Sequence, residues 1–176
     1  MNEIIKKNGI NFGIITGVIS ILITGFIYLV DVKLFTAWWL GIGSIIIYLA
    51  IGIYLLIKTR KELGGVFSFK DAFTTYFISA VIGIAISVVF NILLFNYIDP
   101  SLKDTVQELS IESAVSMMKK FGTPTSEIKK AVEGMSETNQ FETFNQLKGS
   151  AFSIIFSAIF GLILAAIFKS KPKDQY

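Results

Sequence analysis

The sequence predicts an all-α integral membrane protein, a four-helix bundle with a small helical extracytoplasmic insertion between the third and fourth transmembrane helices. Three observations support this fold class. The 176-residue chain is 53% hydrophobic and only 16% charged, whereas soluble domains carry about 25% charged residues. Its charged residues leave four long uncharged segments, and its long polar segment lies between the last two of them. A soluble core of this size could not hide so much apolar surface.

Composition also narrows the chemistry. The chain contains no cysteine and no histidine, which excludes disulfides, thiolate zinc sites, cysteine nucleophiles and imidazole general bases. The net charge of +3 is small, and no basic patch is interleaved with aromatic residues as nucleic-acid binding requires. Glu127, Glu133 and Glu137 could cluster, but carboxylates on a polar helix usually form a solvated face. We expect no catalytic, metal or cofactor site, no nucleic-acid partner and no enzymatic activity.

Four segments without a charged residue predict the membrane spans. They cover residues 8–30, 34–57, 72–98 and 149–168. A helix needs about 20 mostly apolar residues to cross about 30 Å of hydrocarbon, and all four segments reach this length. A buried helix of a soluble protein rarely runs as long without a charge.

The first two transmembrane helices are predicted at about residues 9–30 and 35–57. The first could be a signal peptide, because Lys6 and Lys7 precede it. Its apolar stretch exceeds the usual length of about 7–15 residues, and no small-x-small cleavage site follows. Residues 31–33 turn the chain directly into the second helix, so we expect an uncleaved first span.

The third helix is predicted over residues 70–98. Ser68 and Asp71 fit the two ends of a capping box, with Asp71 in place of Glu and well placed near the positive helix end. The helix should end before Pro100, because proline disfavours a helical conformation in the preceding residue. Its uncharged segment would reach about 40 Å as a helix. We therefore expect the end near Phe95 to tilt or protrude toward the insertion.

Residues 99–148 form the insertion, which holds eight acidic and six basic residues. Apolar side chains recur in it at helical spacing. Gly122 interrupts the pattern, and a new helix should start with Thr123 as N-cap and Pro124 in the first position. We expect two or three short amphipathic helices, too small to fold alone, that pack on the end of the bundle; a disordered insertion is the alternative. The last of them should run into the fourth transmembrane helix, which with its tail fills residues 149–176.

The distribution of lysine and arginine predicts the orientation. Nine basic residues flank the side that the two termini share, and three flank the other side. The nine are Lys6, Lys7, Lys58, Arg60, Lys61, Lys70, Lys169, Lys171 and Lys173, and the three are Lys33, Lys103 and Lys148. Aromatic side chains gather at the second side, as they do at membrane interfaces. We expect a multi-pass protein with both termini in the cytoplasm.

Small residues at helical spacing predict faces on which helices pack closely, because helices in lipid associate through Gly, Ala and Ser. The candidate helix-packing residues are Gly9, Gly13, Gly17, Ser79, Gly83, Ser87, Asn91, Gly149, Ser153, Ser157, Gly161 and Ala165. Packing within one chain is the main interpretation, and a homodimer is the alternative. Asn91 is interpreted as a hydrogen-bonding partner between helices rather than as a ligand site.

Two motifs resemble a known family. They are Gly65-x-x-Ser68-Phe69-Lys70-Asp71-Ala72-Phe73 at the start of the third helix and Phe95-Asn96-Tyr97-Ile98-Asp99-Pro100 at its end. Together with the insertion and the final small-residue helix, they are similar to the bacterial membrane proteins of domain of unknown function 4199. The resemblance covers nearly the whole chain. It implies four spans in a bacterial inner membrane, and it implies no activity, cofactor or catalytic residue.

The function that we predict is that of a structural or accessory membrane protein, which acts through contacts with proteins or lipids, since no span carries an ionisable group in its interior. The alternative is a transport or channel component, formed as an oligomer whose Ser, Thr and Asn residues line a path. A cavity that passes Asn91 and reaches the midplane would favour transport, and a tightly packed bundle would favour the accessory role.

Overall fold

In the computed structural model, which describes residues 2–170, every element of secondary structure is a helix. The α-helices are α1 (Glu3–Val30), α2 (Trp38–Glu62), α3 (Phe69–Leu93), α4 (Ser101–Lys120), α5 (Thr125–Ser136) and α6 (Thr143–Phe168). A 3-10 turn at Val32–Thr36 joins α1 to α2, and a π-helical turn at Leu94–Ile98 extends α3. Four helices are long and apolar enough to cross a membrane: α1, α2, α6, and α3 with its extension to Ile98. The all-α fold of a helical membrane protein is confirmed.

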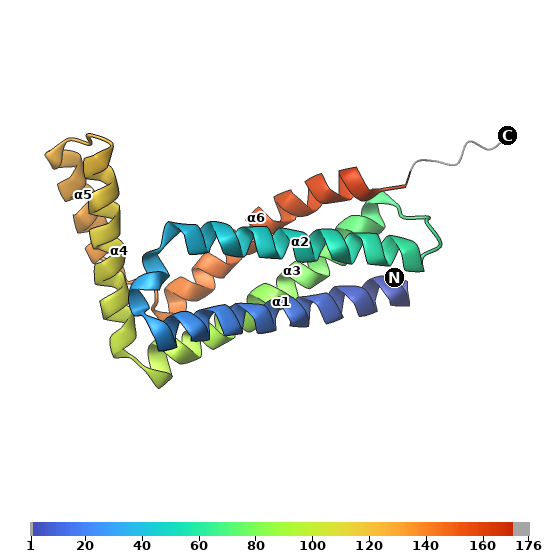
Figure 1. The fold of residues 1–176 in the computed structure, drawn as a ribbon, viewed down its shortest axis with the longest axis horizontal. Coiled ribbons are helices and arrows are strands. Elements are labelled where there is room, and N and C mark those ends of the chain that lie inside the picture. Colours follow the sequence, from blue (N-terminus) through green and yellow to red (C-terminus); the bar gives the residue numbers. More distant parts are fainter. Residues whose placement is uncertain (1, 171–176) are drawn as a thin grey trace.

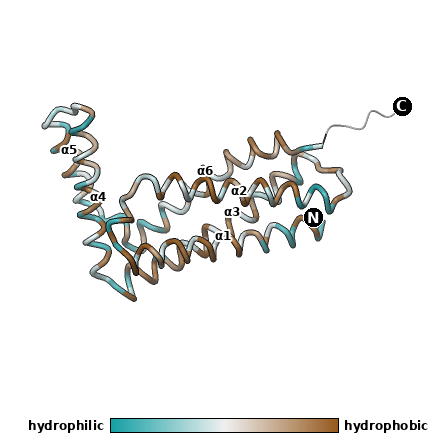
Figure 2. The backbone as a smooth tube through the Cα atoms, viewed as in Figure 1, coloured by the Kyte–Doolittle hydropathy of each residue, from teal (hydrophilic) through white to brown (hydrophobic). Residues whose placement is uncertain are grey.

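The four long helices run alongside one another, and α4 with α5 forms an arm that projects at one end of them (Figure 1). The N-terminus of α1 and the C-terminal end of α6 lie at the opposite end (Figure 1). We call these the insertion end and the terminal end. Hydrophobic residues dominate the long helices, whereas polar residues are frequent in the arm and at the terminal end (Figure 2).

The helix α3 is the central span, because it contacts α1, α2 and α6, and its largest interface is with α1. It starts as predicted: Ser68 accepts a 3.1 Å hydrogen bond from the backbone N–H of Asp71, and its hydroxyl group donates to the Asp71 carboxylate at 2.7 Å. The turn before it uses Gly64 and Gly65, whose φ angles are +69° and +85°. Glycine adopts such angles without a steric penalty.

The end of α3 is fixed to the arm, as predicted. Phe95 and Leu94 of the π-helical turn form a buried cluster with Leu102 and Val106 of α4. Asp99, between the two helices, accepts a 2.6 Å hydrogen bond from the Ser101 hydroxyl group, which lowers the pKa of the carboxyl group. The first turns of the arm therefore belong to the same packed unit as the spans.

Three helix starts differ from the prediction. The helix α1 begins at Glu3 rather than at about residue 9. The helix α2 begins at Trp38 rather than at residue 35, because the preceding residues form the 3-10 turn. The helix α5 begins at Thr125, with Pro124 as its N-cap. The backbone of Pro124 is extended, with ψ of 142°, so Pro124 precedes the helix instead of opening it, and Thr123 is not the N-cap. In contrast, Gly122 ends α4 as expected, with φ of +72°.

Candidate functional site

A cavity whose wall includes many uncharged polar side chains lies between the long helices. Its volume is about 720 Å³, within the range of roughly 300–1,000 Å³ that is typical of small-molecule sites. The uncharged polar residues that line it are Thr16, Ser20, Thr24, Tyr48, Tyr76, Ser79, Ser87, Asn91, Ser110, Gln140, Gln146, Ser150, Ser153 and Ser157. Its remaining lining residues are apolar or glycine, so no charged side chain of residues 2–170 lines it.

The polar residues in the wall of the cavity lie on one face of each helix. Thr16, Ser20 and Thr24 recur every four residues and therefore share one face of α1. Polar residues of α6 from Ser150 to Ser157 follow spacings of three and four and share one face of that helix. Residues of α3 complete the wall between these two faces.

Some polar side chains in the wall of the cavity bond to other residues, and others remain available to a ligand. The hydroxyl groups of Ser20 and Ser87 lie 2.7 Å apart and join α1 to α3. Thr16 and Ser153 donate to carbonyl groups of their own helices. Asn91 lines the cavity, and its side-chain amide makes no hydrogen bond with another residue of the described range 2–170. It therefore presents two N–H donors and one carbonyl acceptor.

Three phenyl rings line the cavity at its insertion end. Phe95 stacks on Phe141 with 4.5 Å between the ring centroids, and it meets the edge of Phe35 at 5.5 Å. These rings come from the π-helical turn, from the residues before α6 and from the 3-10 turn. They narrow the cavity toward the arm.

The helices close together at the terminal end. A buried cluster there joins α2, α3, α6 and the loop before α3 through Leu56, Phe67, Ala72, Leu164 and Ala165. Tyr76 packs against this cluster and also lines the cavity. From Tyr76 to Phe95 the helix rises about 28 Å, close to the hydrocarbon thickness of about 30 Å. The cavity thus extends over most of the length of α3.

The glycines of α1 allow its close approach to α3. A Cβ atom added to Gly9, Gly13 or Gly17 would lie within 2.9 Å of an isoleucine side chain of α3. From the other side, a Cβ atom on Gly83 would lie 3.1 Å from Thr16. These four predicted packing residues therefore lie in the interface between the two helices.

The small-residue stripe of α6 divides in two. At the terminal end, a Cβ atom on Gly161 would lie 2.8 Å from a tyrosine ring of α3, and Ala165 is fully buried. Toward the insertion end, a Cβ atom on Gly149 would meet no atom within 4 Å, and Ser153 and Ser157 line the cavity. Gly149 borders open space instead of packing closely on another helix.

All four predicted packing residues of α3 also line the cavity: Ser79, Gly83, Ser87 and Asn91. The hydrogen bond between helices that we expected of Asn91 is not found among residues 2–170. Sequence reasoning missed Thr16 and Thr24 as cavity residues, although their spacing of four marks them as one polar face of a membrane helix.

A separate polar contact joins α1 to α2 at the terminal end. The side-chain amide of Asn8 donates hydrogen bonds to Thr59 at 3.1 Å and to Glu62 at 2.6 Å. Asn8 and Thr59 are buried, so these bonds satisfy groups that would otherwise be costly to bury. The contact holds α2 against α1 in the part of the protein where the cavity has already ended.

The family model described as "Protein of unknown function (DUF4199)" matches residues 11–170. The chain belongs to this family. The match includes α2 to α6 and most of α1, which confirms the resemblance seen in the sequence. No curated protein and no solved structure matches the chain. The function of this member of DUF4199 is therefore inferred from the cavity and its lining residues.

Proposed function

We propose that this protein is a membrane transport component that binds a small uncharged molecule in the cavity between its spans. The observation that supports this proposal is the polar cavity that passes Asn91 and extends along most of α3. A closely packed bundle would instead have favoured an accessory role. Binding and release of a molecule require no covalent step, so under this proposal the protein is not an enzyme.

The lining determines the class of molecule. Hydroxyl, phenol and amide groups donate and accept hydrogen bonds but carry no charge. An ion in this cavity would lose its hydration and meet no opposite charge from the part of the chain that the structure describes, which is costly. An uncharged molecule with hydroxyl or carbonyl groups would instead pair with Asn91 and with the serine and threonine side chains.

A purely structural reading explains only part of the lining. Hydroxyl groups in membrane helices often bond to their own backbone, as Thr16 and Ser153 do. Such bonds to the backbone do not explain why the hydroxyl groups of α1, α3 and α6 all line the same cavity. The outward surface of the same helices carries large apolar side chains, such as Leu22, Phe26 and Phe156, which are more than half exposed.

Single cysteine variants test the proposal, because the natural chain contains no cysteine. In lipid nanodiscs, Ser157→Cys should react with a water-soluble methanethiosulfonate reagent, because Ser157 lines the cavity. Ile155→Cys lies two residues earlier on the outward face of α6 and should stay unlabelled in lipid. Equal labelling rates for the two variants would refute a hydrated cavity.

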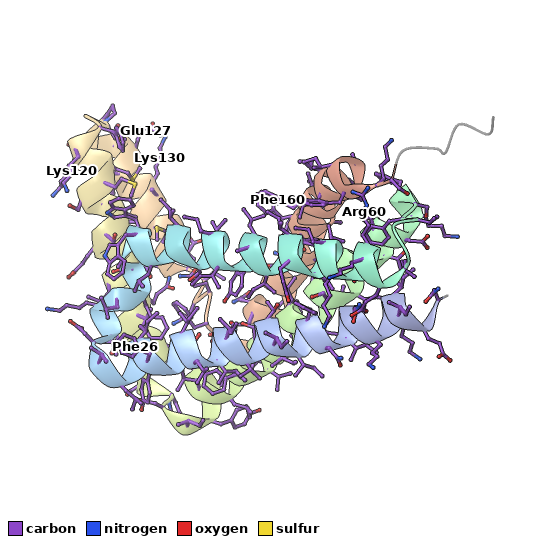
Figure 3. All side chains as sticks on the ribbon, turned by 45° about the vertical axis from the view of Figure 1, so that its right-hand side comes forward. Phe26, Arg60, Lys120, Glu127, Lys130 and Phe160 are labelled. Atoms are coloured by element: carbon purple, nitrogen blue, oxygen red, sulfur yellow. The ribbon has the colours of Figure 1, made fainter. Side chains whose placement is uncertain are left out.

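We further propose that the protein resides in a bacterial inner membrane with both termini in the cytoplasm. The basic residues that support this orientation include Arg60, which lies at the terminal end (Figure 3). Two others of the nine basic residues, Lys171 and Lys173, lie outside the residues that the structure describes. The arm would then lie outside the cytoplasm.

The orientation is tested by cysteine variants at two exposed positions. A membrane-impermeant maleimide added to intact spheroplasts should label Glu133→Cys in the arm and leave Lys61→Cys unlabelled. Both side chains are exposed, so access through the membrane decides the result. Labelling of Lys61→Cys alone would place the arm in the cytoplasm.

The arm favours a second candidate function, an accessory role through contact with a membrane-protein partner, a second copy or lipid. It projects from the spans (Figure 1), and its Phe121 is 83% exposed. Its α5 helix carries exposed charged side chains, including Glu127 and Lys130, which lie 3.8 Å apart and are labelled in Figure 3. A surface with exposed apolar and charged groups suits a protein contact.

Replacing residues 111–137 with a short Gly-Ser linker tests this role. The change spares Leu102 and Val106, which pack on α3, so we expect the variant to insert with little loss of thermal stability. Gln107 reaches Thr138 at 3.4 Å, so a short linker can close the gap. Chemical crosslinks to a partner in native membranes should disappear; their retention would show that the arm is not the contact surface.

A further inference from the structure

The sides of the cavity differ in how they are closed. Packed residues close the terminal end, and three phenyl rings narrow the insertion end. The first half of α2 is the remaining boundary. A Cβ atom added at Gly41 or Gly43 of α2, or at Gly149 of α6, would meet no atom within 4 Å. Within residues 2–170, α2 and α6 share a buried cluster at the terminal end, where Leu56 of α2 packs with Leu164 of α6.

The cavity is therefore open sideways, along the first half of α2. In a bilayer this opening faces hydrocarbon, because the two helices carry exposed apolar side chains, such as Ile45 and Ile46 of α2 and Phe152 of α6. The polar wall, including Ser153, lies behind this apolar border. A molecule that fills both regions needs a polar group on one part and an apolar chain on the other.

We propose that the ligand is an uncharged lipid with a hydroxyl or carbonyl head group, which enters sideways from the bilayer. This inference rests on the proposed function and names its ligand class. The head group would bond to Asn91 and to serine hydroxyl groups, and the chain would remain between α2 and α6. A phosphate-bearing lipid does not fit, because no lysine or arginine among residues 2–170 lines the cavity.

A protection experiment in nanodiscs tests this lipid class. The readout is the labelling rate of Ser153→Cys by N-ethylmaleimide in phosphatidylcholine, with dioleoylglycerol as the added probe. Saturation with the probe should slow labelling roughly tenfold when its concentration is about ten times its Kd. Phosphatidylglycerol at the same concentration should have no such effect. Equal slowing by both lipids would overturn the preference for an uncharged head group.

A filling variant tests the sideways entry. Adding Gly149→Phe to Ser153→Cys places a ring at a residue that lines the cavity and whose added Cβ atom would meet no atom within 4 Å. The effect of dioleoylglycerol should then disappear. Gly134→Phe is the matched control, because Gly134 of α5 also has no atom within 4 Å but lies in the arm, and it should leave the lipid effect unchanged. An unchanged effect with Gly149→Phe would overturn entry along this side.

Other outcomes separate this inference from the proposed function. Labelling of Ser153→Cys that glycerol slows and dioleoylglycerol does not would indicate a water-soluble solute, which overturns the lipid and keeps the cavity as a binding site. Oxidation of Ser153→Cys to a disulfide-linked dimer would show that a second copy covers the opening, which also overturns the lipid. Absence of labelling at both Ser153→Cys and Ser157→Cys would refute the hydrated cavity itself.

Discussion

Phe95→Ala should destabilise the protein by about 3–5 kcal/mol, the usual cost of removing a buried phenyl ring. Phe95 is 2% exposed and stacks on Phe141. It also packs with Leu102 and Val106, so its removal would loosen the contact between the spans and the arm. Because the ring narrows the insertion end of the cavity, the same variant should also speed cysteine labelling at Ser157→Cys.

Unfolding in mixed micelles, followed by circular dichroism, measures the loss of stability. Tyr97→Ala is the matched control, because Tyr97 lies in the same π-helical turn and is 71% exposed. We expect Tyr97→Ala to unfold close to the natural protein. If Phe95→Ala were equally stable, the packed cluster at the insertion end would not hold the arm.

Gly13→Ile should cost roughly 1–3 kcal/mol by overpacking the interface between α1 and α3. A Cβ atom at Gly13 would lie 2.7 Å from Ile82 and 2.9 Å from the backbone carbonyl oxygen of Ser79. Backbone atoms cannot turn aside as a side chain can, so the two helices would have to separate. We expect a smaller effect for Gly83→Ile, because its nearest neighbour, the Thr16 side chain, lies farther away at 3.1 Å.

Gly25→Ile is the control for Gly13→Ile. It makes the same substitution in the same helix, at a position where an added Cβ atom meets nothing within 4 Å. Thermal unfolding in detergent should lower the Tm of Gly13→Ile well below that of Gly25→Ile. Equal Tm values would mean that close approach of α1 and α3 contributes little to stability.

The spans were predictable from sequence because one physical requirement dominates them. A helix in hydrocarbon cannot carry unpaired charge, so gaps between charged residues mark its length. The start of α3 was predictable for a similarly local reason, since Ser68 and Asp71 satisfy each other within one turn. Pro124 shows the limit of local rules: the residue suits either the first helical position or the N-cap, and its ψ angle decides.

The cavity was not predictable from sequence. Residue spacing shows which side chains share one face of a helix, but it does not show whether another helix packs on that face. Gly161 and Gly149 belong to one stripe of α6, yet the first contacts α3 and the second borders open space. The difference arises from how α6 lies along α3: Gly161 meets the rings of Tyr76 and Phe73, and no such neighbour stands beside Gly149. Such long-range geometry between helices leaves no short motif in the sequence.

The proposed function requires that the space between the spans is a cavity with a polar wall, open to a ligand. Power saturation of a nitroxide spin label in nanodiscs tests it most directly, with a label at Asn91→Cys compared with Val89→Cys on the outward face of α3. Val89 is 59% exposed in the structure and should face lipid. We expect the label at position 91 to collide more with a water-soluble nickel complex, and the label at 89 to collide more with oxygen. Equal, oxygen-dominated accessibility at both positions would contradict the account.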